Sequence, residues 1–577
     1  MNSPSPITVP TTQGHGRARF AAFRMAQRTA LLGTMLAAML VIFPMFFLGN
    51  ASGHDFDFHV ASWVDVAQQW HQGIWYPRWA AWANYGFGEP RFIFYPPTSW
   101  MLGAALGSVL PWRIVPGLLI LMTLLLAGMA MFRLGCEWLA PGEAIPAAIF
   151  FAVNPYHLLM IYYRSDFSEL IASALFPLLV VCALRIGRDG AAAMAPISLV
   201  FAAIWLSNAP EAVLASYSLA LLLAVVCLVR KTGRPLAPGA AAIAMGLGLA
   251  AFYILPAAWE QRWVAIGEVL ASGLRPEQNF LFTQASNPEF VIFNWKVSGV
   301  VLLVIGMTGI ASVFAARRRR SRPELWWMML ALAGLAVAMM FPLSVFVWRY
   351  LPKLRFVQFP WRWLGPMGAP CALFLGAAVG QVRKKWVWWV AIGIVLGVLA
   401  GLIIRDTWWD SEDVPTLVNA VRSNRGYEGA DEYEPRGCDR YNLPDDAPRL
   451  TLHNLTGDIL GPANGVRVHV QRWAAESKII SVDSPRELIL ALKLLNYPAW
   501  NVEVNGKEAQ YWSREETGQI MVSLQAGPSR VEIRFHRTRD RTLGILISLT
   551  AALLIAALLI FWKPRKALAG RPGLEAV

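Results

Sequence analysis

A short polar stretch near the N-terminus concentrates side chains that could do chemistry. Residues 53–59 read Gly-His-Asp-Phe-Asp-Phe-His, which places His54, Asp55, Asp57 and His59 close together. Asp55 and His59 share one face of a helix, and Asp55, Asp57 and His59 share one face of a strand. Carboxylates can deprotonate a hydroxyl or hold a divalent cation, and histidine can orient or ligate. We therefore predict catalytic roles for Asp55 and Asp57 and substrate binding by His54 and His59. A divalent cation (Mg or Mn) would have Asp55, Asp57 and His59 as ligands. The alternative is a solvated turn beside the membrane, with its two phenylalanines in lipid.

A second polar stretch, residues 86–97, is rich in glycine and proline, which impose a rigid and turned path. Glu89 and Arg91 are its only charged residues. We predict a catalytic role for Glu89 and substrate binding by Arg91. The alternative is a surface ion pair, which is worth under about 1 kcal/mol.

A third polar stretch, residues 162–169, comes directly before an apolar block and contains Arg164, Asp166 and Glu169. We predict that Asp166 is catalytic and that Arg164 and Glu169 bind substrate. The alternative is structural: Arg164 anchors a helix at the lipid headgroups, Asp166 caps the next helix, and Glu169 completes a capping arrangement.

A fourth stretch, residues 348–363, mixes cations with aromatic side chains. Its cations are Arg349, Lys353, Arg355 and Arg362. A lipid-linked phosphate or pyrophosphate is the natural partner of such a cluster, and the aromatic residues would hold an isoprenoid or acyl tail. We predict substrate binding by Lys353, Arg355, Trp361 and Arg362, with Arg262, which lies between Trp259 and Trp263, as a further cation. The alternative is an aromatic belt with snorkelling arginines.

Composition defines the environment in which these stretches lie. Of the 577 residues, 56% are apolar and only 15% are charged, and the mean hydropathy is +0.44. Apolar blocks of about 20 residues recur, which is the length of a membrane-spanning helix. These values exclude a soluble enzyme, a disordered protein and a secreted disulfide scaffold. The net charge of +14 lies in clusters beside the apolar blocks, as expected of a membrane protein, so we expect no nucleic-acid partner.

The apolar blocks predict twelve transmembrane helices. They lie at about 29–49, 113–133, 144–161, 170–185, 194–209, 211–229, 238–256, 297–315, 324–342, 363–381, 386–404 and 542–562. Block 98–111 is too short to cross, and placing it as a re-entrant or surface segment puts the main basic clusters on one side. Residues 1–28 and 563–577 are then cytoplasmic tails, and the long first loop, 50–112, lies outside. The predicted location is the inner membrane of a bacterium.

Residues 405–541 have strand-like alternation and predict an outer β-sandwich-like domain. The alternating runs lie at 467–473, 488–495, 500–506, 519–524 and 530–535. Asn505-Gly506 is a strong hairpin signal. The five cysteines form no metal-binding or disulfide pattern. The domain is tethered by the last helix, 542–562, and the module before it spans residues 29–404.

The order of these motifs resembles the GT-C superfamily of integral-membrane glycosyltransferases. More narrowly, residues 53–59, 76–79, 85–97, 162–169 and 356–364 resemble bacterial membrane proteins labelled 6-pyruvoyl-tetrahydropterin synthase-related. The stretch Tyr497–Gly506, followed by the last helix, resembles the YfhO-like group. The resemblance implies a GT-C-like membrane fold and transfer of a sugar from a polyprenyl-phosphate donor to a glycan, lipid or protein acceptor on the outer face. It does not imply pterin chemistry, because no soluble histidine cluster is present.

The resemblance also implies roles for individual residues. Asp55 would be the general base, assisted by Asp57 and His59, and Glu89 and Asp166 would occupy two further acidic positions. Arg355 and Arg362 would bind the departing phosphate. Two other functions remain open. A transporter or flippase for a lipid-linked glycan would need charged or broken-helix sites at the membrane midplane. A non-catalytic scaffold would bind envelope glycans through the β-rich domain.

Overall fold

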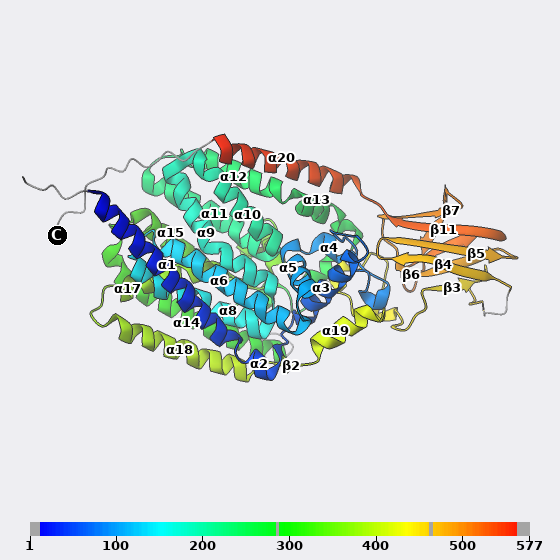
Figure 1. Cartoon of the computed structure of the whole chain (residues 1–577), viewed down its shortest axis with the longest axis horizontal. Helices are drawn as coiled ribbons and strands as arrows, with labels where there is room; N and C mark the ends of the chain where they lie inside the picture. Colours follow the sequence, from blue (N-terminus) through cyan, green and yellow to red (C-terminus); the bar gives the residue numbers. More distant parts are fainter. Residues whose placement is uncertain (1–11, 284–287, 461–464, 562–577) are drawn as a thin grey trace, which may run out of the picture.

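The structure is a computed structural model that describes residues 12–283, 288–460 and 465–561. A bundle of helices forms one end of an elongated molecule, and a β-sheet domain forms the other (Figure 1). The predicted fold class, a polytopic helical membrane protein with a C-terminal β-rich domain, is confirmed. The predicted C-terminal tail and residues 1–11 of the N-terminal tail lie outside the described residues.

The bundle consists of long apolar helices joined by short ones. The long helices are α1 (Thr12–Ile42), α6 (Val115–Gly135), α7 (Pro141–Ala152), α9 (Phe167–Asp189), α10 (Met194–Ser207), α11 (Ala209–Arg230), α12 (Leu236–Leu249), α13 (Ala251–Glu260), α14 (Pro288–Ala315), α15 (Pro323–Met340), α17 (Leu364–Val379), α18 (Lys385–Arg405) and α20 (Arg539–Phe561). The shorter ones are α2 (Met45–Leu48), α3 (Phe56–Trp70), α4 (Arg91–Phe94), α5 (Pro97–Val109), α8 (Pro155–Leu159), α16 (Val345–Tyr350) and α19 (Asp413–Arg422).

The predicted number of twelve transmembrane helices is not confirmed. Within the described ranges, nine helical stretches are long and apolar enough to cross a membrane, or ten if one bent pair counts as a single span. The bent pair is α12 and α13, which meet at 73° and together cover the block predicted at 238–256. The blocks 170–185 and 194–209 belong to one helical stretch, Phe167–Ser207. The block 363–381 contains α17, which has only 16 residues.

The short block 98–111 forms α5, a helix of 13 residues that is not among the candidate spans. Its small residues allow close contact with α3, since a Cβ atom at Gly103 would overlap the Trp63 indole. In Figure 1, α3, α4 and α5 lie together at the end of the bundle next to the β-sheet domain. Whether this block crosses the membrane stays a prediction.

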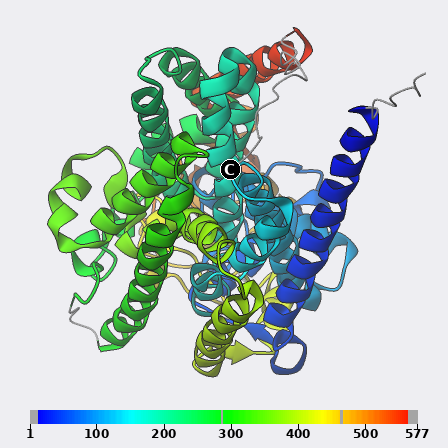
Figure 2. The same ribbon diagram turned by 90° about the vertical axis from the view of Figure 1, so that its left-hand side faces the viewer.

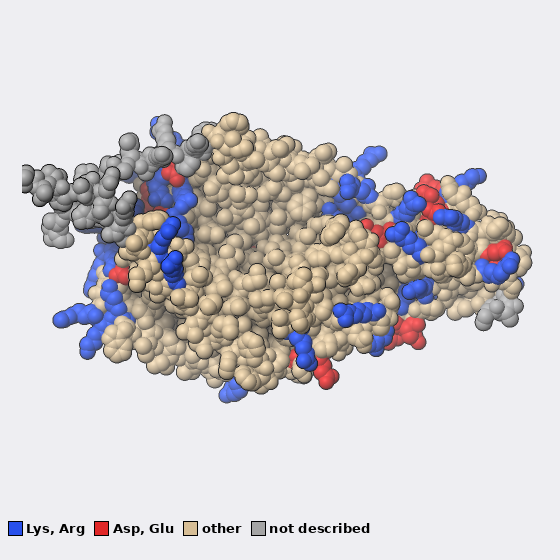
Figure 3. Space-filling model, in the orientation of Figure 1, with Lys and Arg blue, Asp and Glu red and all other residues tan. Residues whose placement is uncertain are grey.

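Basic residues gather at the opposite end of the bundle. On the face shown in Figure 3, Lys and Arg cluster there, while the middle of the bundle is free of charge. Figure 2 looks onto this end and shows α1 and α18 at the edge of the bundle. Ion pairs connect several predicted clusters: Arg133 and Arg188 share Glu137, and Arg318 and Lys385 share Glu143. These clusters therefore lie at one end, as the charge pattern predicts.

The C-terminal domain contains two antiparallel sheets. The strands are β3 (Leu450–His453), β4 (Arg467–Ala474), β5 (Ser477–Ser484), β6 (Leu488–Leu495), β7 (Trp500–Val504), β8 (Lys507–Glu508), β9 (Tyr511–Ser513), β10 (Gln519–Leu524) and β11 (Gly527–Phe535). One sheet has the order β3-β6-β10-β9 and the other β4-β5-β11-β7-β8. A further two-residue pair joins β1 (Asn50–Ala51) to β2 (Trp409–Asp410). Each predicted run contains a strand, and Asn505-Gly506 forms the β7–β8 turn with both residues at positive φ.

An aromatic cluster joins the β-sheet domain to the first outer loop. Trp79 packs against Tyr497, Trp500 and Phe535 at ring distances of 5.9, 5.4 and 5.7 Å. Gly88 lies against the other side of Trp79 with a φ of +80°. Because a Cβ atom at Gly88 would overlap the indole, this position needs glycine for both its backbone and its contact.

We expect Gly88→Ala to lower the thermal stability of the detergent-purified protein. Overpacking costs about 1–3 kcal/mol, and the left-handed backbone adds roughly 1–2 kcal/mol. Gly117→Ala is the matched control, because nothing lies within 4 Å of a Cβ atom at that helical position. Equal melting temperatures for the two variants would contradict this account of the interface.

Candidate functional site

A cavity of about 650 Å³ lies where the first outer loop, the bundle and the C-terminal region meet. Its polar wall carries His54, Asp55, Arg164, Asp166 and Arg362. The remaining wall is largely apolar and includes side chains from α10, α11, α13 and the loop after it, among them Trp205, Val213, Ile254, Ile266, Val269 and Leu274. Three stretches that are far apart in the sequence thus contribute charged groups to one space.

The backbone around Gly53 brings the first two of these stretches together. The amide of Asp55 donates to the carbonyl of Arg164 at 2.8 Å, and the Ser165 hydroxyl donates to the carbonyl of Ala51. A Cβ atom at Gly53 would lie 2.6 Å from the backbone of Tyr163 and Arg164. Only glycine therefore allows residues 51–55 to lie against residues 163–165.

Asp55 lies at the start of α3 and faces the cavity. Its carboxylate accepts hydrogen bonds from Nε and Nη2 of Arg164, the first at 2.9 Å. The Asp55 side chain is 31% exposed, whereas Arg164 is 9% exposed. His59 follows one helical turn later, and its amide donates to the carbonyl of Asp55. Asp55 and His59 therefore lie on one face of a helix, which is one of the two predicted arrangements.

Asp166 is the buried centre of the polar wall. Its Oδ1 accepts from the Ser168 hydroxyl at 2.6 Å and from the Glu169 amide at 2.9 Å, so it caps α9. His59 Nε2 lies 3.5 Å from Asp166, and Nη2 of Arg164 and of Arg362 lie at 3.8 and 3.9 Å. Burial alone would raise the pKa of Asp166, but contact with His59 and the two arginines lowers it below its ordinary value.

Arg362 connects Asp166 to a second buried acid. Its Nε donates to Glu169 Oε2 at 2.9 Å, and Tyr156 donates its hydroxyl hydrogen to the other oxygen of Glu169. The Arg362 guanidinium also donates to the carbonyl of Val357 at 2.8 Å. The wall therefore contains a continuous chain of ion pairs, Asp55–Arg164–Asp166–Arg362–Glu169, which we call the ion-pair chain. Asp166 therefore both caps α9 and takes part in the ion-pair chain.

Two other predicted acids lie away from the cavity. Asp57 is exposed on the opposite side of α3, and it does not line the cavity. Glu89 and Arg91 are buried and form an ion pair at 2.6 Å, so the alternative of a surface pair is wrong. Glu89 also accepts from the amide of Ala430, and Arg91 stacks on Phe58. This pair therefore joins the first outer loop to the C-terminal region, one layer behind the cavity wall.

The structure does not bring the three proposed metal ligands together. Asp57 points away from Asp55 and His59, because α3 separates positions two apart by more than half a turn. Within the described ranges, no group of three or more His, Cys, Asp or Glu side chains is arranged to hold a metal ion. Metal dependence therefore stays a prediction.

The basic-aromatic stretch divides between the cavity and the surface. Lys353, Gln358 and Arg362 line the cavity, whereas Arg355 pairs with Glu277 at 3.6 Å outside it. Lys353 and Gln358 both have positive φ, so the backbone turns sharply at each of them. These turns decide which side chains of the stretch face the cavity. Of the predicted cations of this stretch, Lys353 and Arg362 therefore line the cavity and Arg355 does not. Trp361 is buried behind the wall, and Arg262 stacks on Trp259 and Trp263 away from the cavity.

Sequence reasoning missed two acids of this region. Glu211 is buried in the first turn of α11, and neither of its carboxylate oxygens has a hydrogen-bond partner among the described residues. Its signal was the Asn208-to-Glu211 capping pattern, in which Asn208 accepts from the Glu211 amide. Glu432 lines the cavity, and burial raises its pKa to about 7. Nothing in the sequence distinguishes Glu432 from the other acids of the C-terminal region.

We expect Asp166→Asn to destabilise the detergent-purified protein by about 3–5 kcal/mol at pH 7, because it removes one partner from buried ion pairs. The folded state holds the Asp166 pKa below its ordinary value, so the pairing contributes fully above about pH 4 and is lost as the pH falls. The stability difference from the wild type should therefore be constant from pH 8 to 5 and shrink below about pH 4. Asp57→Asn, at an exposed position, is the control and should stay within about 0.5 kcal/mol. A difference that grows on acidification would contradict the assignment.

Comparison with known proteins places this site in a family. Residues 92–412, more than half of the chain, match the model of the 6-pyruvoyl-tetrahydropterin synthase related domain, described as a membrane protein. This range contains the third and fourth polar stretches and the last part of the second, but it begins after Glu89 and Arg91. No match was found among curated proteins.

Three solved structures are similar to parts of this chain at low identity. The archaeal oligosaccharyltransferase AglB from Archaeoglobus fulgidus, in complex with an inhibitory peptide and a dolichol-phosphate, is 15% identical, with a TM-score of 0.39 over 70% of this chain and 56% of its own. ArnT from Cupriavidus metallidurans, bound to undecaprenyl phosphate, is 13% identical, with a TM-score of 0.35 over 63% of this chain and 62% of its own. The arabinofuranosyltransferase AftD from mycobacteria is 18% identical, with a TM-score of 0.39 over 66% of this chain and 27% of its own.

The chain spans less than two thirds of the length of each of these three structures. The family match covers Arg164, Asp166 and Arg362 of the cavity wall but not His54 or Asp55. The chain belongs to the 6-pyruvoyl-tetrahydropterin synthase related family of membrane proteins.

Proposed function

We propose that this protein is an integral-membrane glycosyltransferase that moves a sugar from a polyprenyl-phosphate donor to an acceptor hydroxyl. The observation that carries the proposal is the cavity itself. It combines an apolar wall, cations and a partly exposed carboxylate within about 650 Å³. A lipid-linked sugar phosphate has three parts that match them: an apolar chain, an anionic phosphate and the carbon at which the sugar reacts.

Asp55 is the best candidate for the general base. It is more exposed than Asp166, at 31% against 4% for the side chains, and it lies at the open end of the ion-pair chain. In the proposed step, the acceptor oxygen bonds to the anomeric carbon of the sugar and gives its proton to Asp55. The bond from that carbon to the phosphate oxygen breaks, and the electron pair leaves with the polyprenyl phosphate.

The departing phosphate needs positive charge on the cavity wall. Lys353 suits this role because its Nζ contacts the amide oxygen of Gln261 at 3.4 Å rather than a carboxylate. Arg362 and Arg164 add positive potential, although each already contacts acids of the ion-pair chain. The apolar residues of α10, α11 and α13 would hold the first isoprene units.

We place the cavity on the outer face of the membrane. The basic clusters lie at the other end of the bundle, and such clusters mark the cytoplasmic side. A lipid-linked donor suits the outer side, where nucleotide sugars are absent. The acceptor and the sugar remain to be identified by assay with a panel of labelled polyprenyl-phosphate sugars.

We expect Asp55→Asn to reduce sugar transfer by at least about a hundredfold, in line with general-base catalysis. The assay follows transfer or hydrolysis of a labelled polyprenyl-phosphate sugar by the purified protein. Asp57→Asn is the matched control, because it makes the same change two residues away on the exposed side of α3 and should keep its activity. Retained activity in Asp55→Asn would remove the base role, and loss in Glu432→Gln instead would assign that role to Glu432.

We expect Lys353→Gln to raise the KM for the donor about tenfold or more, since one charge-assisted contact is worth about 1.5–3 kcal/mol. Arg355→Gln removes the same charge two residues away, outside the cavity, and should leave the KM unchanged. Initial rates over a range of donor concentrations measure both values. An unchanged KM in Lys353→Gln together with a raised KM in Arg355→Gln would assign the phosphate contact to Arg355.

A further inference from the structure

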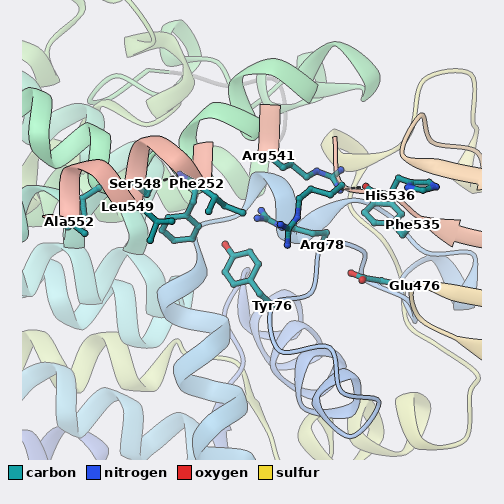
Figure 4. A pocket seen from close by; sticks show the side chains of 13 residues that line it. Tyr76, Arg78, Phe252, Glu476, Phe535, His536, Arg541, Ser548, Leu549 and Ala552 are labelled. Carbon is teal, nitrogen blue, oxygen red and sulfur yellow. Dashed lines mark hydrogen bonds between the residues drawn. The ribbon is translucent and has the colours of Figure 1, made fainter. Parts of the chain in front are cut away.

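A second cavity, of about 610 Å³, lies where the last helix meets the β-sheet domain (Figure 4). It shares no lining residue with the first cavity. Its walls come from the first outer loop, the junction of α12 and α13, the β4–β5 turn and the path from β11 into α20. They include Tyr76, Arg78, Leu249, Phe252, Glu476, His536, Arg537, Arg541, Leu549 and Ala552.

One half of this cavity is apolar and faces the region where lipid would lie. Leu249, Phe252, Leu549 and Ala552 form this half, and the Leu549 side chain is 57% exposed on the outside of the bundle. Ser548 adds no free polar group, because its hydroxyl donates to the carbonyl of Gly248 and accepts from the amide of Phe252. A hydrocarbon chain is therefore the expected neighbour of this half.

The other half contains an arginine whose hydrogen-bond donors are not all paired. Arg78 Nη1 and the Tyr76 hydroxyl are buried, and neither has a hydrogen-bond partner among the described residues. The Arg78 guanidinium lies over the Tyr76 ring, 4.3 Å from its centre. In Figure 4, both side chains project from the first outer loop into the cavity, toward α20.

Neighbouring acids compensate this charge only in part. Arg541 binds both oxygens of Glu260 at 2.7 Å, and Tyr497 donates to the same carboxylate, so that acid is already engaged. Burial lowers the pKa of Arg78, and this effect exceeds the opposite effects of Glu260 and Glu476. A buried guanidinium without full compensation is costly, so an anion would be stabilised here. Arg537, exposed at the rim, adds a second cation.

We propose that this cavity is a second binding site, which takes the phosphate group of an anionic membrane lipid. The phosphate contacts Arg78, Tyr76 and Arg537, and the adjoining chain lies along Phe252, Leu249 and Leu549. A phosphate diester of a phospholipid and a polyprenyl monophosphate share this chemistry. The proposal does not depend on the proposed transferase activity, because it concerns binding at a separate cavity.

The site would couple the last helix to the β-sheet domain. Its cations come from the first outer loop and from the segment that joins β11 to α20, and its apolar half comes from α12, α13 and α20. A bound lipid would contact all of them at once. Binding should therefore raise the stability of the whole chain by mass action.

The test uses the full chain in detergent, with lipid binding measured by native mass spectrometry and by thermal shift. The probes are phosphatidylglycerol, a polyprenyl monophosphate, phosphatidylcholine and inorganic phosphate. We expect the first two to bind the wild type and raise its melting temperature, and whichever binds more tightly identifies the source. Equal binding of phosphatidylcholine, or binding of inorganic phosphate as tight as that of either lipid, would overturn the assignment to an anionic lipid.

Arg78→Gln should weaken binding of the preferred lipid at least tenfold. Arg262→Gln is the matched control, because Arg262 also stacks on an aromatic ring, at 4.2 Å from the centre of Trp259, but lies outside both cavities. Ala552→Trp fills the apolar half without changing any charge, so it should weaken lipid binding even if Arg78→Gln does not fold. Unchanged lipid affinity in Ala552→Trp or in folded Arg78→Gln would refute the site. Sugar transfer is assayed separately, so its loss or retention does not bear on this result.

Discussion

The end of the bundle next to the β-sheet domain depends on the ion-pair chain, in which charges are buried only because each contacts charges of the opposite sign. Arg164 lies between Asp55 and Asp166, and Arg362 lies between Asp166 and Glu169. A buried charge without a partner costs several kcal/mol, so these side chains have few other arrangements of similar energy. The ion-pair chain holds three segments of the protein together: residues 51–55, the turn before α9 and the turn before α17. Gly53 and the left-handed Ser165 shape the backbone so that the first two can meet.

Exposure differs along the ion-pair chain, from buried acids to one partly exposed acid. Glu169 is fully buried and Asp166 nearly so, whereas Asp55 at the open end is 31% exposed. The buried members hold the arginines in place. Burial raises the pKa of Asp166, but its contacts with His59 and the two guanidinium groups lower the pKa by more. The partly exposed member, Asp55, is the one that faces the cavity, while its carboxylate stays paired with Arg164. A rigid charged platform with one accessible carboxylate is a preorganised arrangement for proton transfer.

Much of this arrangement could be predicted from local sequence patterns, and the failures have physical causes. The i, i+4 spacing of Asp55 and His59 and the capping pattern at Asp166 depend only on neighbouring residues, and both occur as expected. The strand runs and the Asn505-Gly506 turn were predictable for the same reason. In contrast, the choice between Lys353 and Arg355 depends on two residues with positive φ, which a run of cations does not reveal. The burial of Glu89 with Arg91 involves Ala430, more than 300 positions away. The count of twelve spans is not confirmed, because some predicted blocks contain short helices such as α17, which has 16 residues.

The two cavities suggest a general distinction between the cations of this protein. Arginines in contact with carboxylates, such as Arg362 with Glu169 or Arg541 with Glu260, hold segments together. Lys353 and Arg78 differ, because each faces a cavity with an apolar wall and contacts an amide oxygen or an aromatic ring instead of an acid. A cation placed between an apolar wall and water matches the phosphate of a lipid, whose chain and headgroup need the two environments side by side. Cations paired with acids therefore hold the architecture together, and Lys353 and Arg78 are the ones on which the proposed phosphate sites rest.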